Sequence, residues 1–434
     1  MPNDKTLHIT GGTPLSGRIS VSGAKNAATK MMVASLLTEE PVKLKNVPKI
    51  GDVEITSDIV KVVGGNVTHQ DHTIELHTPK IENTSVKQLS RKNRISILAI
   101  SPLLHRVGRA AVPVLDGDKI GPRPVDFHIQ SLEQMGARIS EDASGFHAEA
   151  TKLKGTTISL PYPSVGATEN IILAATLAEG RTSIYNAATE PEILDLIKLL
   201  QRMGAIIEFR ANRVIIIDGV ERLHGAEYTI MPDRLEAASY AVAAIATDGE
   251  VTIDNARQDH LSTFLNTIRR IGGDYEVHDD GISFRRHTNG LKGAEIETET
   301  WPGFSTDWQQ PLTVLLTQAE GLSVIHETVY EDRFGYTKSL NSMGANIALF
   351  TKCLGEIECR FKGQTHKHSA IVQGRTPLHA TNVEIPDIRA GMAHVVAALI
   401  AEGESKLTGV EHLLRGYDQL LEKLEAIGAE FKTG

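Results

Sequence analysis

Polar side chains recur at one kind of position in this chain, directly before or at the start of a long apolar run. They are Lys25 and Asn26, Ser164 and Thr168, Asp233 and Arg234, Thr306 and Asp307, and Asp387 and Arg389, with Arg94 opening a looser copy. Each run is rich in Ala and apolar on all sides, which predicts a fully buried helix. We therefore expect these polar residues at the N-terminal ends of buried helices.

The N-terminal end of a helix suits an anion, because its first N–H groups lack intrahelical partners and the helix dipole is positive there. Several such ends directed at one place would bind phosphate or carboxylate groups. Asp233, Asp307 and Asp387 have a second explanation, since an Asp at this position commonly caps its own helix. The pattern leaves both explanations open.

A turn-rich loop over residues 112–128, VPVLDGDKIGPRPVDFH, carries further charges: Asp116, Asp118, Lys119, Arg123, Asp126 and His128. Its Gly and Pro residues favour turns, and such a loop can be functional or simply solvated. Because PRPVDFH leads into a predicted helix, we expect Arg123 near another helix N-terminus. Arg415, beside Gly416 and ahead of an amphipathic stretch, is explained equally well by a helix-opening ion pair.

The two cysteines, Cys353 and Cys359, lie in CLGEIEC and flank a predicted hairpin. No His stands at metal-ligand spacing from them, so we interpret both as structural. The HKH sequence at 366–368 is interpreted as a solvated loop. The chain has no GxxxxGK[ST], GxGxxG, HExxH or paired CxxC motif, so we predict no metal and no cofactor.

An internal repeat of about 70 residues organises the elements that must position these groups. A Gly pair or Gly-Ala pair recurs at Gly64, Gly136, Gly204, Gly272, Gly344 and Gly428. Each repeat reads as a buried helix, a strand, an amphipathic helix and a hairpin, and residues 6–22 add two short strands. Six repeats predict an α/β fold in two groups of three.

Composition narrows the possible partners. The chain has 434 residues, a net charge of -9 and an isoelectric point near 6.0, so no broad basic surface is available for nucleic acid. No segment is long and apolar enough to span a bilayer, and the start MPNDKTLHIT lacks the core of a signal peptide. We predict a cytoplasmic protein without nucleic-acid or membrane partners, and the oligomeric state stays open.

The ordered motifs resemble those of the enolpyruvyl transferases along nearly the whole chain. They are SGAKNAA, LKNVP, GPRPVDFHI, SVGATENI, AATLAEG, EPEI, PDRLEA, PGFSTDWQ, ETVYEDRF, DIRAG and HLLRGY. The resemblance implies a two-domain inside-out α/β barrel with three repeats per domain and an active site in the cleft between the domains. Residues 24–231 would form the first domain, and residues 1–23 with 232–434 the second.

The resemblance also implies the reaction. The enolpyruvyl group of phosphoenolpyruvate would move to the 3-hydroxyl of UDP-N-acetylglucosamine with release of phosphate, as the first committed step of peptidoglycan precursor synthesis. Addition and elimination of this kind need cations for the anionic groups, an acid and a base. Two alternatives are another acceptor, such as a nucleotide or shikimate 3-phosphate, and a catalytically silent paralogue that only binds the UDP-sugar.

Family positions assign the residues by resemblance. Phosphoenolpyruvate-binding positions are Lys25, Asn26, Arg123 and Arg415. UDP-sugar positions are Arg94, Arg123, Pro124, Val125, Asp126, Phe127, Tyr162, Pro163, Ser164, Val165, Asp307 and Val329. The predicted catalytic set is Asp118, Lys25, Asp307, Arg415 and Asp387, with Asp307 as the base nearest the sugar hydroxyl and Asp387 with Arg389 shaping the site of the adduct.

Asp118 departs from the family pattern, because most members carry a Cys there, in a GGC motif, and this chain has DGD. The family's Cys donates a proton and is alkylated by fosfomycin. A carboxylic acid can replace it if burial or a neighbouring carboxylate, such as Asp116, raises its pKa from about 3.9. We predict that Asp118 is the general acid and that the enzyme resists fosfomycin. Tyr162 and Trp308 are further departures, close to the UDP-sugar positions.

Overall fold

The computed structural model describes residues 6–89, 94–113, 124–357 and 359–434. Within these ranges the chain forms two compact units, each with its own hydrophobic core. The first unit lies between Gly23 and Met231, and the second combines the residues up to Ser22 with those from Pro232 onwards. The two core clusters share no residue, so each unit buries its apolar side chains by itself.

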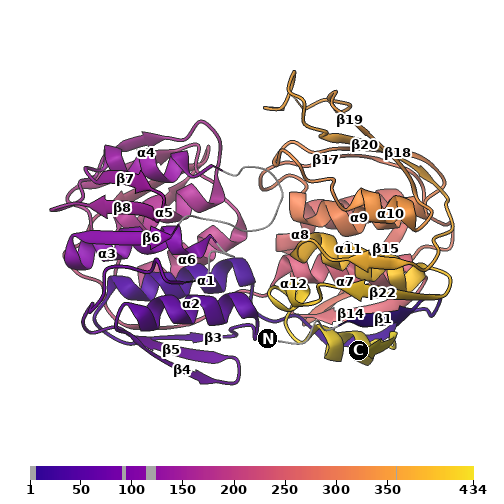
Figure 1. Ribbon diagram of the computed structural model, residues 1–434, viewed down its shortest axis with the longest axis horizontal. Helices are drawn as coiled ribbons and strands as arrows, with labels where there is room; N and C mark the ends of the chain where they lie inside the picture. Colours follow the sequence, from indigo (N-terminus) through magenta and orange to yellow (C-terminus); the bar gives the residue numbers. More distant parts are fainter. Residues whose placement is uncertain (1–5, 90–93, 114–123, 358) are drawn as a thin grey trace. The chain divides into compact units, whose positions relative to one another are not determined.

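The first unit contains three repeats, which are clearest when traced in order in Figure 1. The first repeat is α1 (Lys25–Ala34), β3 (Val42–Lys45), α2 (Gly51–Val62), β4 (Asn66–Gln70) and β5 (Thr73–His77). The second is η2 (Ile95–Ala99) leading into α3 (Ile100–Val107), then β6 (Arg109–Pro113), α4 (Asp126–Gln134), β7 (Arg138–Asp142) and β8 (Gly145–Glu149). The third is β9 (Thr157–Ser159), α5 (Val165–Ala175), β10 (Arg181–Tyr185), α6 (Pro191–Arg202), β11 (Ile206–Arg210) and β12 (Val214–Asp218), and β13 (Ala226–Thr229) follows.

The second unit begins with β1 (Leu7–Thr10) and β2 (Ser16–Ser20) and continues with three more repeats. The first is α7 (Arg234–Ala246), β14 (Glu250–Asp254), α8 (Gln258–Ile271), β15 (Gly273–Val277) and β16 (Gly281–Arg286). The second is β17 (Glu295–Glu297), α9 (Thr306–Thr317), β18 (Gly321–His326), α10 (Thr337–Ser342), β19 (Asn346–Phe350) and β20 (Ser369–Gly374). The third is β21 (Asn382–Glu384), α11 (Ile388–Ile400), β22 (Glu404–Thr408), α12 (Glu411–Leu414), α13 (Leu420–Ala426) and β23 (Glu430–Thr433).

The described strands form six small sheets, three in each unit. In the first unit, β13 returns from the end of the unit to pair in parallel with β3 of the first repeat. In the second unit, β2 pairs in parallel with β14. Each unit is thus closed by a strand that is distant in sequence from its partner.

The last repeat differs from the predicted order, because it has no hairpin of its own. Instead β1 lies between β22 and β23 and pairs antiparallel with both, which Figure 1 shows as an indigo strand beside yellow ones. An unpaired strand edge would leave N–H and C=O groups without partners. The N-terminal strand supplies those partners in place of a hairpin strand.

The apolar runs form the buried helices that the sequence predicts. Every residue of α7 is buried, and α7, α9 and α11 pack against one another in the second unit. In the first unit α3 packs on α5, and α1 packs on α2 and α6. No helix among the described residues is both long enough and apolar enough to cross a membrane.

Candidate active site

Lys25 is the first residue of α1, where the buried helix reaches the surface of the first unit. Its Nζ lies 2.9 Å from Oδ2 of Asp52, which is buried in the first turn of α2. Packing of α1 on α2 brings the two side chains together. The carboxylate restricts the ammonium group to one position, so Lys25 can present its charge to an anion with little loss of side-chain entropy on binding.

A second ion pair lies deeper on the same helix. Lys30 Nζ is 3.9 Å from Oε1 of Glu169, a carboxylate in α5 that is 1% exposed. Burial raises the pKa of Glu169 to about 7, and the negative charges of Glu192 and Glu190 act in the same direction while Lys30 opposes them. Glu169 has no role in the sequence-based assignment, although it lies in the SVGATENI motif.

Arg94 lies near His128, the last residue of the PRPVDFH motif, in the first unit. Desolvation lowers the pKa of His128 to about 3, and the positive charge of Arg94 contributes. Asn170 Nδ2 lies 3.3 Å from His128 Nδ1, and Ser101 Oγ donates to Asn170 Oδ1 over 2.7 Å. His128 is therefore a neutral group that accepts from Asn170 at Nδ1, and it keeps the start of α4 next to α5.

The predicted UDP-sugar positions 124–127 and 162–165 lie at two helix N-termini. Pro124 and Val125 precede α4, and Asp126 and Phe127 form its first turn. Tyr162 and Pro163 precede α5, where Ser164 is the N-cap and its Oγ accepts from the N–H of Ala167. Because α4 packs on α5, the two groups belong to adjacent elements.

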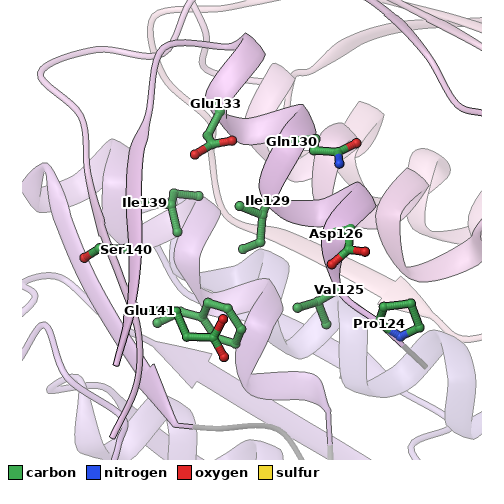
Figure 2. A pocket seen from close by; sticks show the side chains of 10 residues that line it. Pro124, Val125, Asp126, Ile129, Gln130, Glu133, Ile139, Ser140 and Glu141 are labelled. Carbon is green, nitrogen blue, oxygen red and sulfur yellow. The ribbon is translucent and has the colours of Figure 1, made fainter. Parts of the chain in front are cut away.

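An open pocket of about 490 Å³ lies beside α4, between that helix and strands β7 and β8. Figure 2 shows Ile129 and Ile139 on its walls, with the carboxylates of Asp126, Glu133 and Glu141 around them. Among the described residues that line it, none has a basic side chain. The pocket adjoins the predicted UDP-sugar positions Pro124, Val125 and Asp126.

The predicted site residues Asp233, Asp307 and Asp387 of the second unit differ in the contacts that they make. Asp233 and Asp387 cap α7 and α11, and Oδ1 of each accepts two backbone N–H bonds of 2.8–3.1 Å. In α9 the cap is Ser305, whose Oγ accepts from the N–H of Asp307. Capping therefore explains Asp233 and Asp387, whereas Asp307 keeps its carboxylate for other contacts.

Asp307 is held by two buried arginines. Its Oδ1 lies 2.5 Å from Arg333 Nη2, and its Oδ2 lies 3.5 Å from Arg389 Nε. Burial alone would lower the pKa of Arg333, but the charges of Asp307 and Asp387 outweigh it and the pKa is raised. The pKa of Arg389 is likewise raised despite burial, by Tyr417 and Asp307. The Asp307 carboxylate thus has an arginine cation at each of its two oxygens.

Glu327 is a residue that sequence reasoning missed. It is fully buried at the end of β18, and its Oε1 accepts from the N–H groups of Val329 (2.8 Å) and Tyr330 (3.1 Å). Its Oε2 accepts from Thr306 Oγ1 (2.9 Å) and Gln309 Nε2 (3.3 Å) on α9. Glu327 thus fixes Val329, a predicted UDP-sugar position, to the helix that carries Asp307. The only signal in the sequence was the ETVYEDRF motif.

Arg415 follows α12 as its C-cap. It does not open a helix, so the helix-opening ion pair that was one explanation of this residue is wrong. The adjacent Gly416 lies against Ile388 in the first turn of α11, where a Cβ atom would be 2.6 Å from Ile388 Cγ2. The end of α12 can approach α11 this closely only with glycine at this position. Arg415 is thereby placed beside the helix that Asp387 caps.

Four charged residues of the predicted loop at 112–128 lie outside the described residues: Asp116, Asp118, Lys119 and Arg123. Their roles stay predictions. The remaining predicted phosphoenolpyruvate positions divide between the units, with Lys25 and Asn26 at the start of α1 in the first and Arg415 in the second.

Two interpretations of the cysteine region are wrong. Cys353 and Cys359 flank no hairpin, because the described residues between β19 and β20 contain no strand. His368 of the HKH sequence is fully buried instead of solvated, and its Nε2 lies 3.4 Å from Cys353 Sγ. His326 lies close to these residues as well, but it belongs to β18 and is distant from them in sequence, so their spacing did not indicate a cluster.

Comparison with known proteins identifies the family. Residues 9–424 match the family model described as EPSP synthase (3-phosphoshikimate 1-carboxyvinyltransferase). The chain belongs to the EPSP synthase family. Among curated members of the family, UDP-N-acetylglucosamine 1-carboxyvinyltransferase of Protochlamydia amoebophila (strain UWE25) is 48% identical over 98% of this chain and 93% of that protein. The enzyme of the same name from Chlamydia trachomatis serovar D is also 48% identical, over 98% of this chain and 97% of its own.

Solved structures of the EPSP synthase family share the fold. The enolpyruvyl transferase NikO from Streptomyces tendae superposes with a TM-score of 0.87 over 100% of this chain and 99% of its own, at 23% identity. EPSP synthase from Acinetobacter baumannii gives a TM-score of 0.73 at 18% identity, over 99% and 100%. These likenesses, together with the six repeats, confirm the predicted two-domain α/β fold.

Proposed function

We propose that this protein transfers the enolpyruvyl group of phosphoenolpyruvate to the 3-hydroxyl of UDP-N-acetylglucosamine and releases phosphate. The observation that carries the proposal is the 48% identity, over nearly the full chain, to relatives named UDP-N-acetylglucosamine 1-carboxyvinyltransferase. The reaction is the first committed step of peptidoglycan precursor synthesis. We place it in the cytoplasm, and its loss should affect cell shape and division.

Lys25, with Arg123 and Arg415, binds the anionic groups of phosphoenolpyruvate in this proposal, and Asn26 adds a hydrogen bond. The 2.9 Å pair between Lys25 and Asp52 supports this role, because the ammonium group is oriented before substrate arrives. The proposal requires the residues of both units to act on the same two substrates.

Asp307 is the proposed base at the sugar hydroxyl. Its carboxylate is in the first turn of α9, is 23% exposed, and is held by Arg333 and Arg389. A carboxylate fixed in this way can orient the 3-hydroxyl and accept its proton as the oxygen attacks C2 of phosphoenolpyruvate. Asp118 supplies the proton that C3 gains, and Asp387 acts through the start of α11 and Arg389.

The acceptor is tested by phosphate release. The purified enzyme is mixed with phosphoenolpyruvate and, in parallel, with UDP-N-acetylglucosamine, shikimate 3-phosphate or a uridine nucleotide. We expect release only with UDP-N-acetylglucosamine. Release with a different acceptor would replace the proposed substrate, and binding of the UDP-sugar without release would indicate a silent paralogue.

Asp118 is tested with fosfomycin. Wild type should keep its activity and form no covalent adduct, because a carboxylate is a much poorer nucleophile towards an epoxide than a thiolate. Asp118→Asn should lose turnover by roughly a hundredfold or more, the scale of general acid catalysis, while still binding UDP-N-acetylglucosamine.

Asp118→Cys is the matched variant for this test. It should retain turnover and become sensitive to fosfomycin, with an adduct on residue 118 seen by mass spectrometry. An Asp118→Asn variant with undiminished phosphate release, or a fosfomycin adduct on the wild-type loop, would refute the role of Asp118.

A further inference from the structure

We propose that His326, Cys353, Cys359 and His368 bind a structural zinc ion in the second unit. His326 is the last residue of β18, His368 immediately precedes β20, and both cysteines lie in the segment between β19 and β20. The four potential ligand atoms all lie within 4.8 Å of one another. A site of this kind is separate from the residues assigned to catalysis.

The distances fit tetrahedral zinc coordination. The sulfur atoms of Cys353 and Cys359 are 3.4 Å apart, and Cys353 Sγ is 3.4 Å from His368 Nε2. Zinc at about 2.3 Å from sulfur and about 2.0 Å from nitrogen separates tetrahedral ligands by roughly 3.3 to 3.8 Å. Two thiolates and two imidazoles are also a donor set typical of structural zinc.

Both histidines are oriented as metal ligands by their other ring nitrogen. His326 Nδ1 lies 3.0 Å from Oε2 of Glu297, and His368 Nδ1 lies 2.8 Å from the carbonyl oxygen of His366. Each of these oxygens accepts, so each Nδ1 carries the proton and each Nε2 presents a lone pair. A carboxylate or carbonyl behind the imidazole is the usual outer contact of a zinc-binding His.

His326 also has an unexplained polar atom. Its side chain is fully buried, and its Nε2 has no hydrogen-bond partner among the described residues. A buried nitrogen without a partner is costly, so it points to a missing ligand. A zinc ion shared with Cys353, Cys359 and His368 would use this lone pair.

The segment around the cysteines is fitted closely to its surroundings. Glu297 accepts from the N–H groups of Glu356 and Ile357, both over 2.8 Å. A Cβ on Gly355 would lie 2.2 Å from Glu297 Oε2 and 2.5 Å from His326 Nδ1, so only glycine allows this approach. Gly355 therefore lets the segment between the two cysteines pass close to His326.

The zinc site would also fix part of the acceptor site, a consequence that rests on the proposed function. Arg360, next to Cys359, donates from Nη2 to the carbonyl oxygen of Val329, and its Nη2 lies 3.4 Å from Oε1 of Glu331. Val329 is a proposed UDP-sugar contact. Loss of the metal should raise the KM for UDP-N-acetylglucosamine severalfold and change the KM for phosphoenolpyruvate little.

Metal analysis of the full-length enzyme, purified without chelator, tests the site itself and needs no substrate. We expect one zinc per chain, and loss of that zinc in Cys353→Ser and Cys359→Ser. His379→Asn is the control, because His379 is an exposed histidine of the same unit outside the cluster and its variant should keep the zinc.

Cobalt substitution covers the case in which the serine variants fail to fold. Wild-type enzyme exchanged with Co²⁺ should show thiolate-to-cobalt charge transfer and the strong visible bands of tetrahedral cobalt. The chain has only two cysteines, so any such signal must come from this site. Wild type without zinc that also gains no tetrahedral cobalt signal would overturn the proposal, as would a disulfide between Cys353 and Cys359 in freshly purified enzyme.

Discussion

At the scale of single residues, two buried carboxylates and one partly exposed carboxylate carry most of the information about this protein. Glu169, Glu327 and Asp307 lie in or beside the family motifs, and each has a different set of partners. Glu327 accepts four hydrogen bonds and Asp307 pairs with two arginines. Within the described part of the chain, the Glu169 carboxylate accepts no hydrogen bond and lies 3.9 Å from the Lys30 ammonium group. Their effects on stability and substrate binding should therefore differ.

Glu169 should make stability depend on pH. Its pKa is about 7 in the fold against 4.5 as the reference value, so the folded state holds a proton that the unfolded chain releases. Its contribution is complete below about pH 4.5 and lost as pH rises through about 7. The free energy of unfolding of wild type relative to Glu169→Gln should fall by about 3 kcal/mol across this window.

Urea unfolding at several pH values measures this difference. Glu133→Gln, on the exposed side of α4, is the control and should follow the wild-type profile. A constant difference between wild type and Glu169→Gln from about pH 5 to about pH 8 would contradict the assignment.

Glu327→Gln should weaken the link between Val329 and α9. The NH₂ group of the new amide only donates hydrogen bonds. In one orientation it would face the backbone N–H groups of Val329 and Tyr330, and in the other the donors on Thr306 and Gln309, so two hydrogen bonds are lost either way. The expected loss of stability is about 1–3 kcal/mol, with a higher KM for UDP-N-acetylglucosamine. Chemical unfolding and steady-state kinetics measure both, and Glu320→Gln, an exposed carboxylate at the start of β18, should change neither.

At the scale of elements, the starts of the buried helices differ in how they are capped. Asp233 and Asp387 satisfy the N–H groups of α7 and α11, which leaves less positive charge at those ends than the sequence suggested. On α9 the cap is Ser305, and Asp307 does not cap the helix. The short helix α12 then ends against α11 through Gly416.

Gly416→Ala should move the end of α12. The new methyl group would meet Ile388 at 2.6 Å, so α12 must shift and carry Arg415 with it. We expect a loss of about 1–3 kcal/mol of stability and a higher KM for phosphoenolpyruvate. Gly335→Ala is the control, because a Cβ there meets nothing within 4 Å. An unchanged KM in a folded Gly416→Ala protein would show that Arg415 does not bind this substrate.

At the scale of the whole molecule, the division of the chain between the two units determines which fragments can fold alone. The residues from Gly23 to Met231 contain all strands of their three sheets. The second unit depends on the N-terminus, because β1 is an inner strand of one sheet and β2 is the edge strand that pairs with β14. Thr6 and Gly434 exchange backbone hydrogen bonds of 3.3 and 3.0 Å.

Three fragments test this dependence. Residues 23–231 should fold alone and unfold cooperatively, whereas residues 232–434 should not fold, because β22 and β23 lose the strand between them. A permuted fragment that joins Gly434 through a short linker to residues 6–22 should restore folding. Circular dichroism during thermal unfolding distinguishes the three, and cooperative unfolding of residues 232–434 alone would contradict the prediction.

The sequence by itself determined most of the local elements and their order, apart from the hairpins predicted in the last repeat and at the cysteines. Uniform apolar runs identified the buried helices, glycine pairs marked the repeats, and motifs at fixed positions indicated the family. These signals are readable because periodicity and turn preferences act over a few residues. They also placed Lys25 and Asp307 in the first turns of their helices, as the structure has them.

Only the tertiary structure decided which distant residues meet. The insertion of β1 between β22 and β23, the pairing of Asp307 with Arg333 and Arg389, and the cluster of His326 with Cys353, Cys359 and His368 join residues from different elements. Such contacts follow from strand pairing and from the burial of charges that need partners, and neither leaves a periodic mark in the sequence.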